Sequence, residues 1–257
     1  MLEIYINSLL IILVLVTLMW ILSIIITNVS IVDLFWGTGF VITNTYYFFS
    51  SGEPNLIKYI LLFLVFIWGS RLTIYLSIRN IGKGEDFRYQ KFRKDYGNNR
   101  YWWISFFQTF LLQGLLIWII SLPLLGANFY SNDNEPTLLM YVAVLIWLIG
   151  FMFEAGGDYQ LAKFKINPDN KGKVLDYGFW KYTRHPNYFG DSAVWWAYAL
   201  LAISVGAYWY IIGSILMTLL IIKVSGVALL EKTLNVKDGY SEYVRKTSAF
   251  LPWFPKK

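Results

Sequence analysis

Long runs of apolar residues, separated by short polar breaks, dominate this chain. Residues 4–26 carry no charge, and the later runs approach the roughly 20 residues that an α-helix needs to cross a bilayer. The breaks contain the residues typical of loops, as in 51–55, in 128–136 and near Gly206. The pattern therefore predicts seven transmembrane helices, at residues 4–26, 31–49, 57–78, 104–125, 138–156, 191–206 and 208–230.

Composition agrees with this interpretation. Hydrophobic residues make up 57% of the 257 positions and charged residues only 15%, whereas soluble domains carry roughly 25% charged residues. No internal repeat or low-complexity segment divides the sequence. We therefore expect an all-α integral membrane bundle in which residues 1–257 form a single transmembrane domain.

The basic residues predict the orientation of the helices. Segments 79–103, 157–190 and 231–257 hold seven, six and six of the 22 Lys and Arg residues, while 50–56 and 126–137 hold none. Cytoplasmic loops are enriched in Lys and Arg. The three basic segments are thus predicted to be cytoplasmic, which places the N-terminus outside and the C-terminus in the cytoplasm.

Several kinds of chemistry are disfavoured by residue content. The chain has no Cys and a single His, His185, so thiolate and multi-His metal sites are not expected. The net charge of +6 is explained by cytoplasmic loops beside anionic lipid. Membrane lipid is therefore an expected partner, and neither nucleic acid nor metal is.

Ionisable residues within or near predicted spans are costly and so are functional candidates. Asp33 begins the second helix, and Trp68, Arg71, Tyr75 and Arg79 share one face of the third at three- and four-residue spacing. Each also has a structural interpretation. Asp33 could cap a helix, Arg71 could pair with a buried carboxylate, and the tryptophans could anchor the helices at the membrane interface.

The basic segments combine cations with aromatic rings and an amide. Residues 163–191 contain five lysines together with Arg184-His185-Pro186-Asn187-Tyr188. This mixture suits a ligand with phosphates and a stackable ring, such as a nucleotide. The known soluble signatures are incomplete, because 82–84 lacks the third glycine of a dinucleotide fingerprint and 170–173 lacks the upstream glycine of a P-loop.

At this point the sequence resembles a known family. Residues 178–191, followed by Trp195-Trp196, are similar to the signature of the steroid 5-alpha-reductase family, and most similar to its bacterial-type membrane branch. The resemblance continues in residues 68–72, 79–89, 153–161, 240–243 and 250–255. Arg-His-Pro-x-Tyr alone is shared with isoprenylcysteine methyltransferases, so the several blocks together carry the resemblance.

The resemblance implies a seven-helix reductase that holds NADPH between cytoplasmic helix ends and loops. Its cofactor contacts would fall on Tyr75, Arg79, Asp158, Lys165, Arg184, His185, Asn187, Tyr188 and Asp191. Two positions depart from the family pattern. Lys165 stands where the family frequently has Arg, and a lysine cannot pair with phosphate in the bidentate way that arginine does. Asp191 stands where the family frequently has Glu, and its carboxylate lies one methylene closer to the backbone.

The implied reaction transfers hydride to the carbon–carbon double bond of a 3-oxo-Δ4-steroid or similar lipophilic enone that enters from the bilayer. Attack on the beta carbon builds negative charge on the carbonyl oxygen, which a proton donor stabilises. The family uses a carboxylate–tyrosine pair here. We assign this pair, as a hypothesis, to Asp33 and Tyr75, with Asp33, Trp36 and Trp68 in contact with substrate.

Two other function classes remain open. One is an S-adenosylmethionine-dependent methyltransferase of an isoprenyl or lipid substrate, although that cofactor has no phosphate to explain the cations. The other is a non-catalytic sterol-binding membrane protein or a transporter. The abundance of Ile, Asn, Lys and Tyr indicates an AT-rich genome and so a bacterial inner membrane, with the endoplasmic reticulum as the alternative. The active site is predicted to face the cytoplasm.

Overall fold

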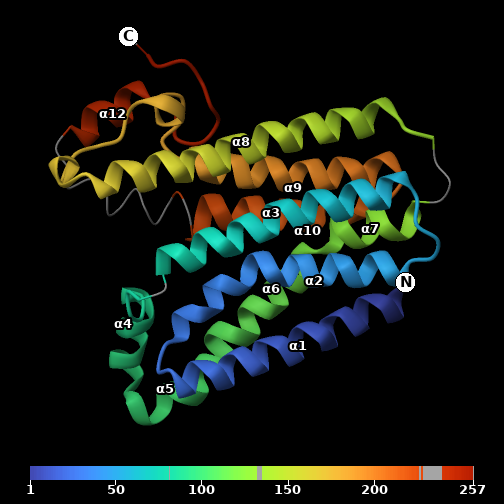
Figure 1. Cartoon of the computed structure of the whole chain (residues 1–257), viewed down its shortest axis with the longest axis horizontal. Coiled ribbons are helices and arrows are strands. Elements are labelled where there is room, and N and C mark those ends of the chain that lie inside the picture. The colour runs from blue at the N-terminus through green and yellow to red at the C-terminus, as the bar shows by residue number, and fades with distance from the viewer. Residues whose placement is uncertain (81, 132–134, 226, 228–238, 257) are drawn as a thin grey trace. The chain divides into compact units, whose positions relative to one another are not determined.

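The computed structural model describes residues 1–80, 82–131, 135–225, 227 and 239–256. Every regular element in these residues is a helix (Figure 1), which confirms the all-α prediction for this part of the chain. In chain order the elements are α1 (Leu2–Ile25), η1 (Val29–Leu34), α2 (Phe35–Ser50), α3 (Leu56–Asn80), α4 (Phe87–Tyr96), α5 (Asn98–Ser105), η2 (Phe106–Leu111), α6 (Leu112–Ile120), α7 (Leu122–Tyr130), α8 (Leu138–Ile166), η3 (Pro168–Asn170), η4 (Gly178–Lys181), α9 (Pro186–Ser204), η5 (Tyr208–Ile211), α10 (Ile212–Leu219), η6 (Leu220–Ser225) and α12 (Tyr240–Lys246).

Four helical segments of the described chain are long and apolar enough to cross a membrane: Leu2–Ile25, Leu56–Asn80, Asn98–Tyr130 and Leu138–Ile166. This protein is therefore a membrane protein. Helices also occupy the other three predicted ranges, although α2 is short and residues 226 and 228–230 of the seventh range lie outside the described residues. Seven spans, the placement of the termini and the single domain stay predictions.

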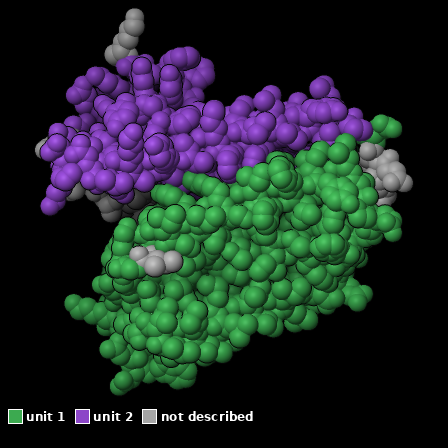
Figure 2. All heavy atoms as spheres, in the orientation of Figure 1, with its two compact units in different colours: residues 1–135, 205–210 green, residues 136–204, 211–257 purple. Residues whose placement is uncertain are grey.

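The chain divides into two compact units (Figure 2). Unit 1 comprises Met1–Glu135 with Val205–Tyr210, and unit 2 comprises Pro136–Ser204 with Ile211–Lys257. In unit 1, α2 and α3 meet at two glycines. A Cβ on Gly37 would lie 2.1 Å from the carbonyl oxygen of Gly69, so the two backbones approach with no side chain between them, as in many membrane helix pairs.

In unit 2, α8 and α9 run side by side (Figure 1) and also meet at glycines. A Cβ on Gly190 would lie 2.3 Å from the backbone nitrogen of Glu154 and 2.4 Å from the carbonyl oxygen of Gly150. Beyond this contact α8 continues to Ile166, and α9 begins at Pro186. The two helices and the loop that joins them carry most of the predicted cofactor residues.

Candidate functional site

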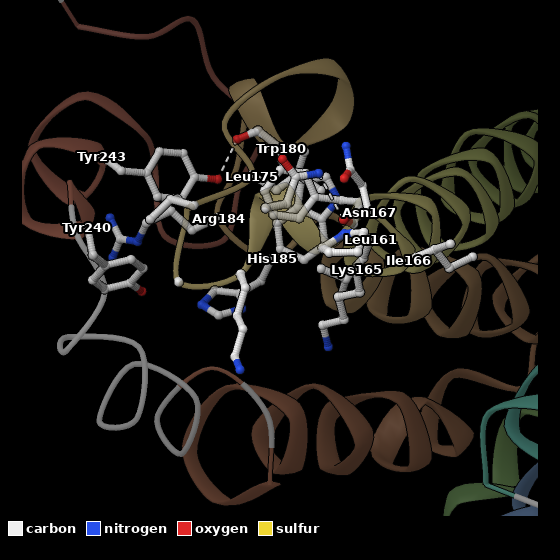
Figure 3. Close-up of a pocket in the computed structure, with 16 residues that line it drawn as sticks. Leu161, Lys165, Ile166, Asn167, Leu175, Trp180, Arg184, His185, Tyr240 and Tyr243 are labelled. Carbon is white, nitrogen blue, oxygen red and sulfur yellow. Dashed lines mark hydrogen bonds between the residues drawn. The ribbon is translucent and has the colours of Figure 1, made fainter.

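A cavity of about 730 Å³ opens in unit 2 at the end of α8 (Figure 3). Its walls come from the last turns of α8, the loop between α8 and α9, the segment before α9, and α12. The lining residues are Leu161, Phe164, Lys165, Ile166, Asn167, Pro168, Asn170, Lys171, Gly172, Val174, Leu175, Trp180, Arg184, His185, Tyr240 and Tyr243. Three predicted cofactor residues, Lys165, Arg184 and His185, are thus brought together in one cavity.

The loop between α8 and α9 is held in shape by its own polar side chains. Asn170 donates from Nδ2 to the carbonyl oxygen of Phe164 at 2.9 Å, which turns the chain back on the end of α8. Trp180 donates from Nε1 to the carbonyl oxygen of Gly157 at 3.1 Å. Phe164, Trp180 and Leu175 form a buried apolar cluster, so one side of the cavity is an apolar surface with an aromatic ring.

The lining of the cavity is also basic. Lys165, Lys171 and Arg184 all line it, and the neutral or charged imidazole of His185 adds donor capacity. His185 is only 1% exposed and stacks on Tyr188 with ring centroids 5.7 Å apart. Three cations with aromatic and apolar walls provide charge for phosphates and a surface for a planar ring.

The remaining predicted cofactor residues of unit 2 lie on α8 and α9, outside the described lining of the cavity. Asn187 donates from Nδ2 to Oδ1 of Asp158 at 3.0 Å, which links the two helices. Asp158 is 5% exposed, so this hydrogen bond helps to satisfy a buried carboxylate. Asp191 lies one helical turn beyond Asn187 on α9.

In unit 1, Asp33 lies at the centre of a polar network. Its Oδ2 accepts from Nη2 of Arg88 at 2.9 Å, and its Oδ1 accepts from the hydroxyl of Tyr89 at 2.8 Å. Gln113 donates to the same hydroxyl at 3.3 Å and accepts from Nε1 of Trp36 at 2.8 Å. Burial, followed by the negative charge of Asp33, raises the pKa of Tyr89 above its ordinary value.

The segment between α3 and α4 brings Arg88 and Tyr89 to Asp33. Its glycines, Gly82 and Gly84, have positive φ angles of 82° and 76°, which permit the turn. Glu85 then accepts from the backbone of Val29 at 2.9 Å and pairs with Arg93 at 2.8 Å. Asp86 caps α4 through the backbone of Arg88 at 2.9 Å, and its own N–H donates to Ser30.

The other predicted residues of unit 1 lie along α2 and α3. Trp36 and Phe40 have ring centroids 6.1 Å apart, and Phe40 lies 5.9 Å from Trp68, which is fully buried. Tyr75 lies beside two guanidinium groups, with Arg71 5.2 Å and Arg79 5.7 Å from its ring centroid. Asp33 thus has Tyr89 as its tyrosine partner, whereas the sequence hypothesis paired it with Tyr75.

Tyr89 is the partner of Asp33 that the sequence analysis did not name. The segment that contains it, residues 79–89, was part of the resemblance, but the contact with Asp33 joins positions 56 residues apart. Spacing along one helix cannot indicate such a contact. In the described part of the chain, no group of three or more His, Cys, Asp or Glu residues is arranged to hold a metal ion.

Comparisons with known proteins give two findings. The family described as "Protein of unknown function (DUF1295)" matches residues 19–247, which is most of the chain. The Delta(14)-sterol reductase of Arabidopsis thaliana is 34% identical over 93 residues, a region that covers 32% of this chain and 25% of that protein. No solved structure matches the chain.

Proposed function

The chain belongs to the DUF1295 family, and on that premise we propose that it is a membrane-embedded, NADPH-dependent reductase. Its substrate would be the carbon–carbon double bond of a 3-oxo-Δ4-steroid or similar lipophilic enone from the bilayer. The partial likeness to a sterol reductase supports the broader reductase class, and the 5-alpha-reductase branch is part of the proposal. The observation that carries it is the cavity of unit 2, with its cations and aromatic walls.

The residues of this cavity fit NADPH in charge and in shape. A volume of about 730 Å³ lies within the range of cavities that enclose small ligands. Lys165 and Lys171 would hold phosphate groups, and Trp180 would lie against a ring. Bound NADPH supplies a hydride. Asp158, Asn187, Tyr188 and Asp191 on the same two helices are further proposed contacts, and Tyr75 and Arg79 of α3 stay contacts that the sequence resemblance implies.

The network around Asp33 would act on the substrate. When hydride adds to the beta carbon of an enone, negative charge builds on the carbonyl oxygen, and a hydroxyl donor placed there lowers the barrier. Tyr89 is the donor that we assign, because its raised pKa keeps the phenol protonated. Asp33, paired with Arg88, would hold the hydroxyl of Tyr89 in place. When substrate binds, this hydroxyl would donate its hydrogen bond to the substrate oxygen instead of to the carboxylate of Asp33.

The cofactor is tested by NADPH binding to the detergent-purified protein, followed through nicotinamide fluorescence, with S-adenosylmethionine as competitor. We expect Lys165→Ala to weaken binding by about tenfold or more, since a charge-assisted bond of about 1.5 kcal/mol or more is lost. Lys181→Ala is the matched control, because Lys181 is an exposed cation of the same loop that does not line the cavity. We expect it to bind NADPH as the unchanged protein does.

Two outcomes would reject this assignment. If Lys165→Ala binds NADPH as tightly as Lys181→Ala and the unchanged protein do, the cavity is not the cofactor site. Binding of S-adenosylmethionine without NADPH binding would move the protein to the methyltransferases, which share the Arg184–Tyr188 motif.

The donor is tested separately with Tyr89→Phe, whose NADPH affinity should be unchanged. Its rate of enone reduction should fall by about tenfold to a hundredfold, and an unchanged rate would exclude Tyr89 from catalysis.

A further inference from the structure

The end of the chain folds back on the segment that precedes α9. Trp253 donates from its backbone to the carbonyl oxygen of Tyr182 at 2.9 Å. The hydroxyl of Thr183, which is fully buried, donates to the carbonyl oxygen of Phe250 at 2.9 Å. Residues 239–254, which we name the C-terminal segment, are therefore joined by hydrogen bonds to the segment that precedes α9.

Arg184 makes the central contact with this segment. Its Nη1 donates to the carbonyl oxygen of Thr247 at 2.7 Å and to that of Val244 at 3.1 Å. Its backbone N–H donates to the carbonyl oxygen of Ser248 at 2.8 Å. The last carbonyls of a helix have no partner within the helix and carry partial negative charge. A guanidinium group at the end of α12 satisfies two such carbonyls and complements their charge.

The helix held in this way forms one wall of the cavity. Tyr240 and Tyr243 both project from α12 into the lining, where Figure 3 shows them on the side of Arg184. They are 2% and 7% exposed, and the hydroxyl of Tyr243 donates to the carbonyl oxygen of Trp180. Without α12 the cavity would lose both rings and would open on that side.

We propose that the C-terminal segment is a component of the ligand site and that Arg184 is a positioning residue that holds it there. Nη1 donates to two carbonyl oxygens at the end of α12, so loss of the guanidinium group loosens one wall of the cavity. The phosphate charge is then met by Lys165 and Lys171. This inference rests on the proposed function for the identity of the ligand, but the attachment of α12 can be tested without ligand.

The first experiment measures amide hydrogen exchange in residues 240–246 of the ligand-free protein. We expect Arg184→Ala to increase exchange there by about tenfold or more, because two hydrogen bonds to carbonyl oxygens at the end of the helix are lost. Arg245→Ala is the matched control, since Arg245 lies on α12 and does not line the cavity. Equal exchange in Arg184→Ala and the unchanged protein would overturn the proposal.

The second experiment distinguishes an effect of Arg184 through the wall of the cavity from a direct contact between Arg184 and a phosphate group. The chain has no cysteine, so a double substitution, Arg184→Cys with Ser248→Cys, provides a single reversible cross-link. The backbone N–H of Arg184 donates to the carbonyl oxygen of Ser248 at 2.8 Å, so the two backbones are close neighbours and this pair is the one we choose for a disulfide. The reduced protein lacks the guanidinium group and its contacts with α12, whereas the oxidised protein lacks the guanidinium group but keeps the segment attached.

We expect the reduced double variant to bind NADPH about tenfold more weakly than the unchanged protein, and oxidation to restore most of that affinity. An oxidised variant as weak as the reduced one would show that the charge of Arg184 acts on the ligand directly, and would overturn the proposal. If the unchanged protein binds no NADPH, the proposed function fails, and hydrogen exchange still decides whether Arg184 holds α12.

Discussion

The contact between α8 and α9 predicts a large effect for the smallest possible substitution, Gly190→Ala. The added methyl would lie 2.3 Å from the backbone nitrogen of Glu154 and 2.4 Å from the carbonyl oxygen of Gly150, where ordinary contact requires 3.4 Å or more. Backbone atoms of a helix cannot rotate away as a side chain does. The two helices would therefore have to separate by about 1 Å, which weakens the packing along their length.

The magnitude follows from two opposing terms. Overpacking a close contact costs about 1–3 kcal/mol, with the upper end expected where backbone must move. Alanine in a helix recovers about 0.5–1 kcal/mol relative to glycine. For Gly190→Ala we expect a net loss of about 2 kcal/mol, which corresponds to a fall in Tm of about 4–8 °C for a chain of this size.

Gly157→Ala is the control on the facing helix. Its Cβ would lie 3.1 Å from Cγ of Pro186, so a shift of a few tenths of an ångström suffices, and the helix preference of alanine offsets most of the cost. Thermal unfolding in detergent can be followed by tryptophan fluorescence, since Trp147 on α8 and Trp195 on α9 are both buried. Equal Tm values for Gly190→Ala and the unchanged protein would refute the close approach of the two helices.

Three further predictions use the same thermal assay. Burial alone would raise the pKa of Asp86, but the hydrogen bonds and charge of Arg88 outweigh it and lower the pKa below 3.8. The extra stability of the unchanged protein over Asp86→Asn should thus be complete at about pH 6 and diminish as the pH falls below 3.8, whereas a pH-independent difference would contradict it. Lys58→Met should lower the free energy of unfolding by about 2 kcal/mol, because the buried Nζ donates to two loop carbonyl oxygens at 2.8 and 3.0 Å. An unchanged Tm would show that water satisfies these two carbonyl oxygens when the ammonium group is absent. Asn187→Leu should cost about 1.5–3 kcal/mol, because it removes a donor from the buried Asp158, and a smaller loss would mean that another donor takes its place.

The sequence predicted the apolar helices well and their polar extensions poorly. A helix lies in the described part of each predicted range, but the fifth was expected to end at residue 156, and α8 continues to Ile166. Hydropathy reports where lipid ends, and a helix can continue into water with polar residues. Likewise α9 begins at Pro186 instead of residue 191, since proline suits the first turn of a helix. The short helices α4 and α12 carry too many charges to give an apolar signal.

The candidate site was predicted to the extent that its residues are neighbours in sequence. Arg184 and His185 belong to one motif and line one cavity with Lys165. By contrast, Arg184 contacts residues at the end of α12 that lie about 60 positions away in the sequence. Asp33 and Tyr89 are also far apart, at 56 positions. Neither helical periodicity nor motif spacing contains information on contacts of that range.

The length of α8 has a consequence for access. Its 29 residues extend about 44 Å at 1.5 Å per residue, whereas the hydrocarbon layer of a bilayer is about 30 Å thick. About a third of the helix must therefore stand in the headgroup region or in water, and its last turns are the ones that carry Lys165. Under the proposed function, a charged nucleotide would dock on this protruding end without shedding its hydration into lipid, and an oily substrate would stay in the bilayer.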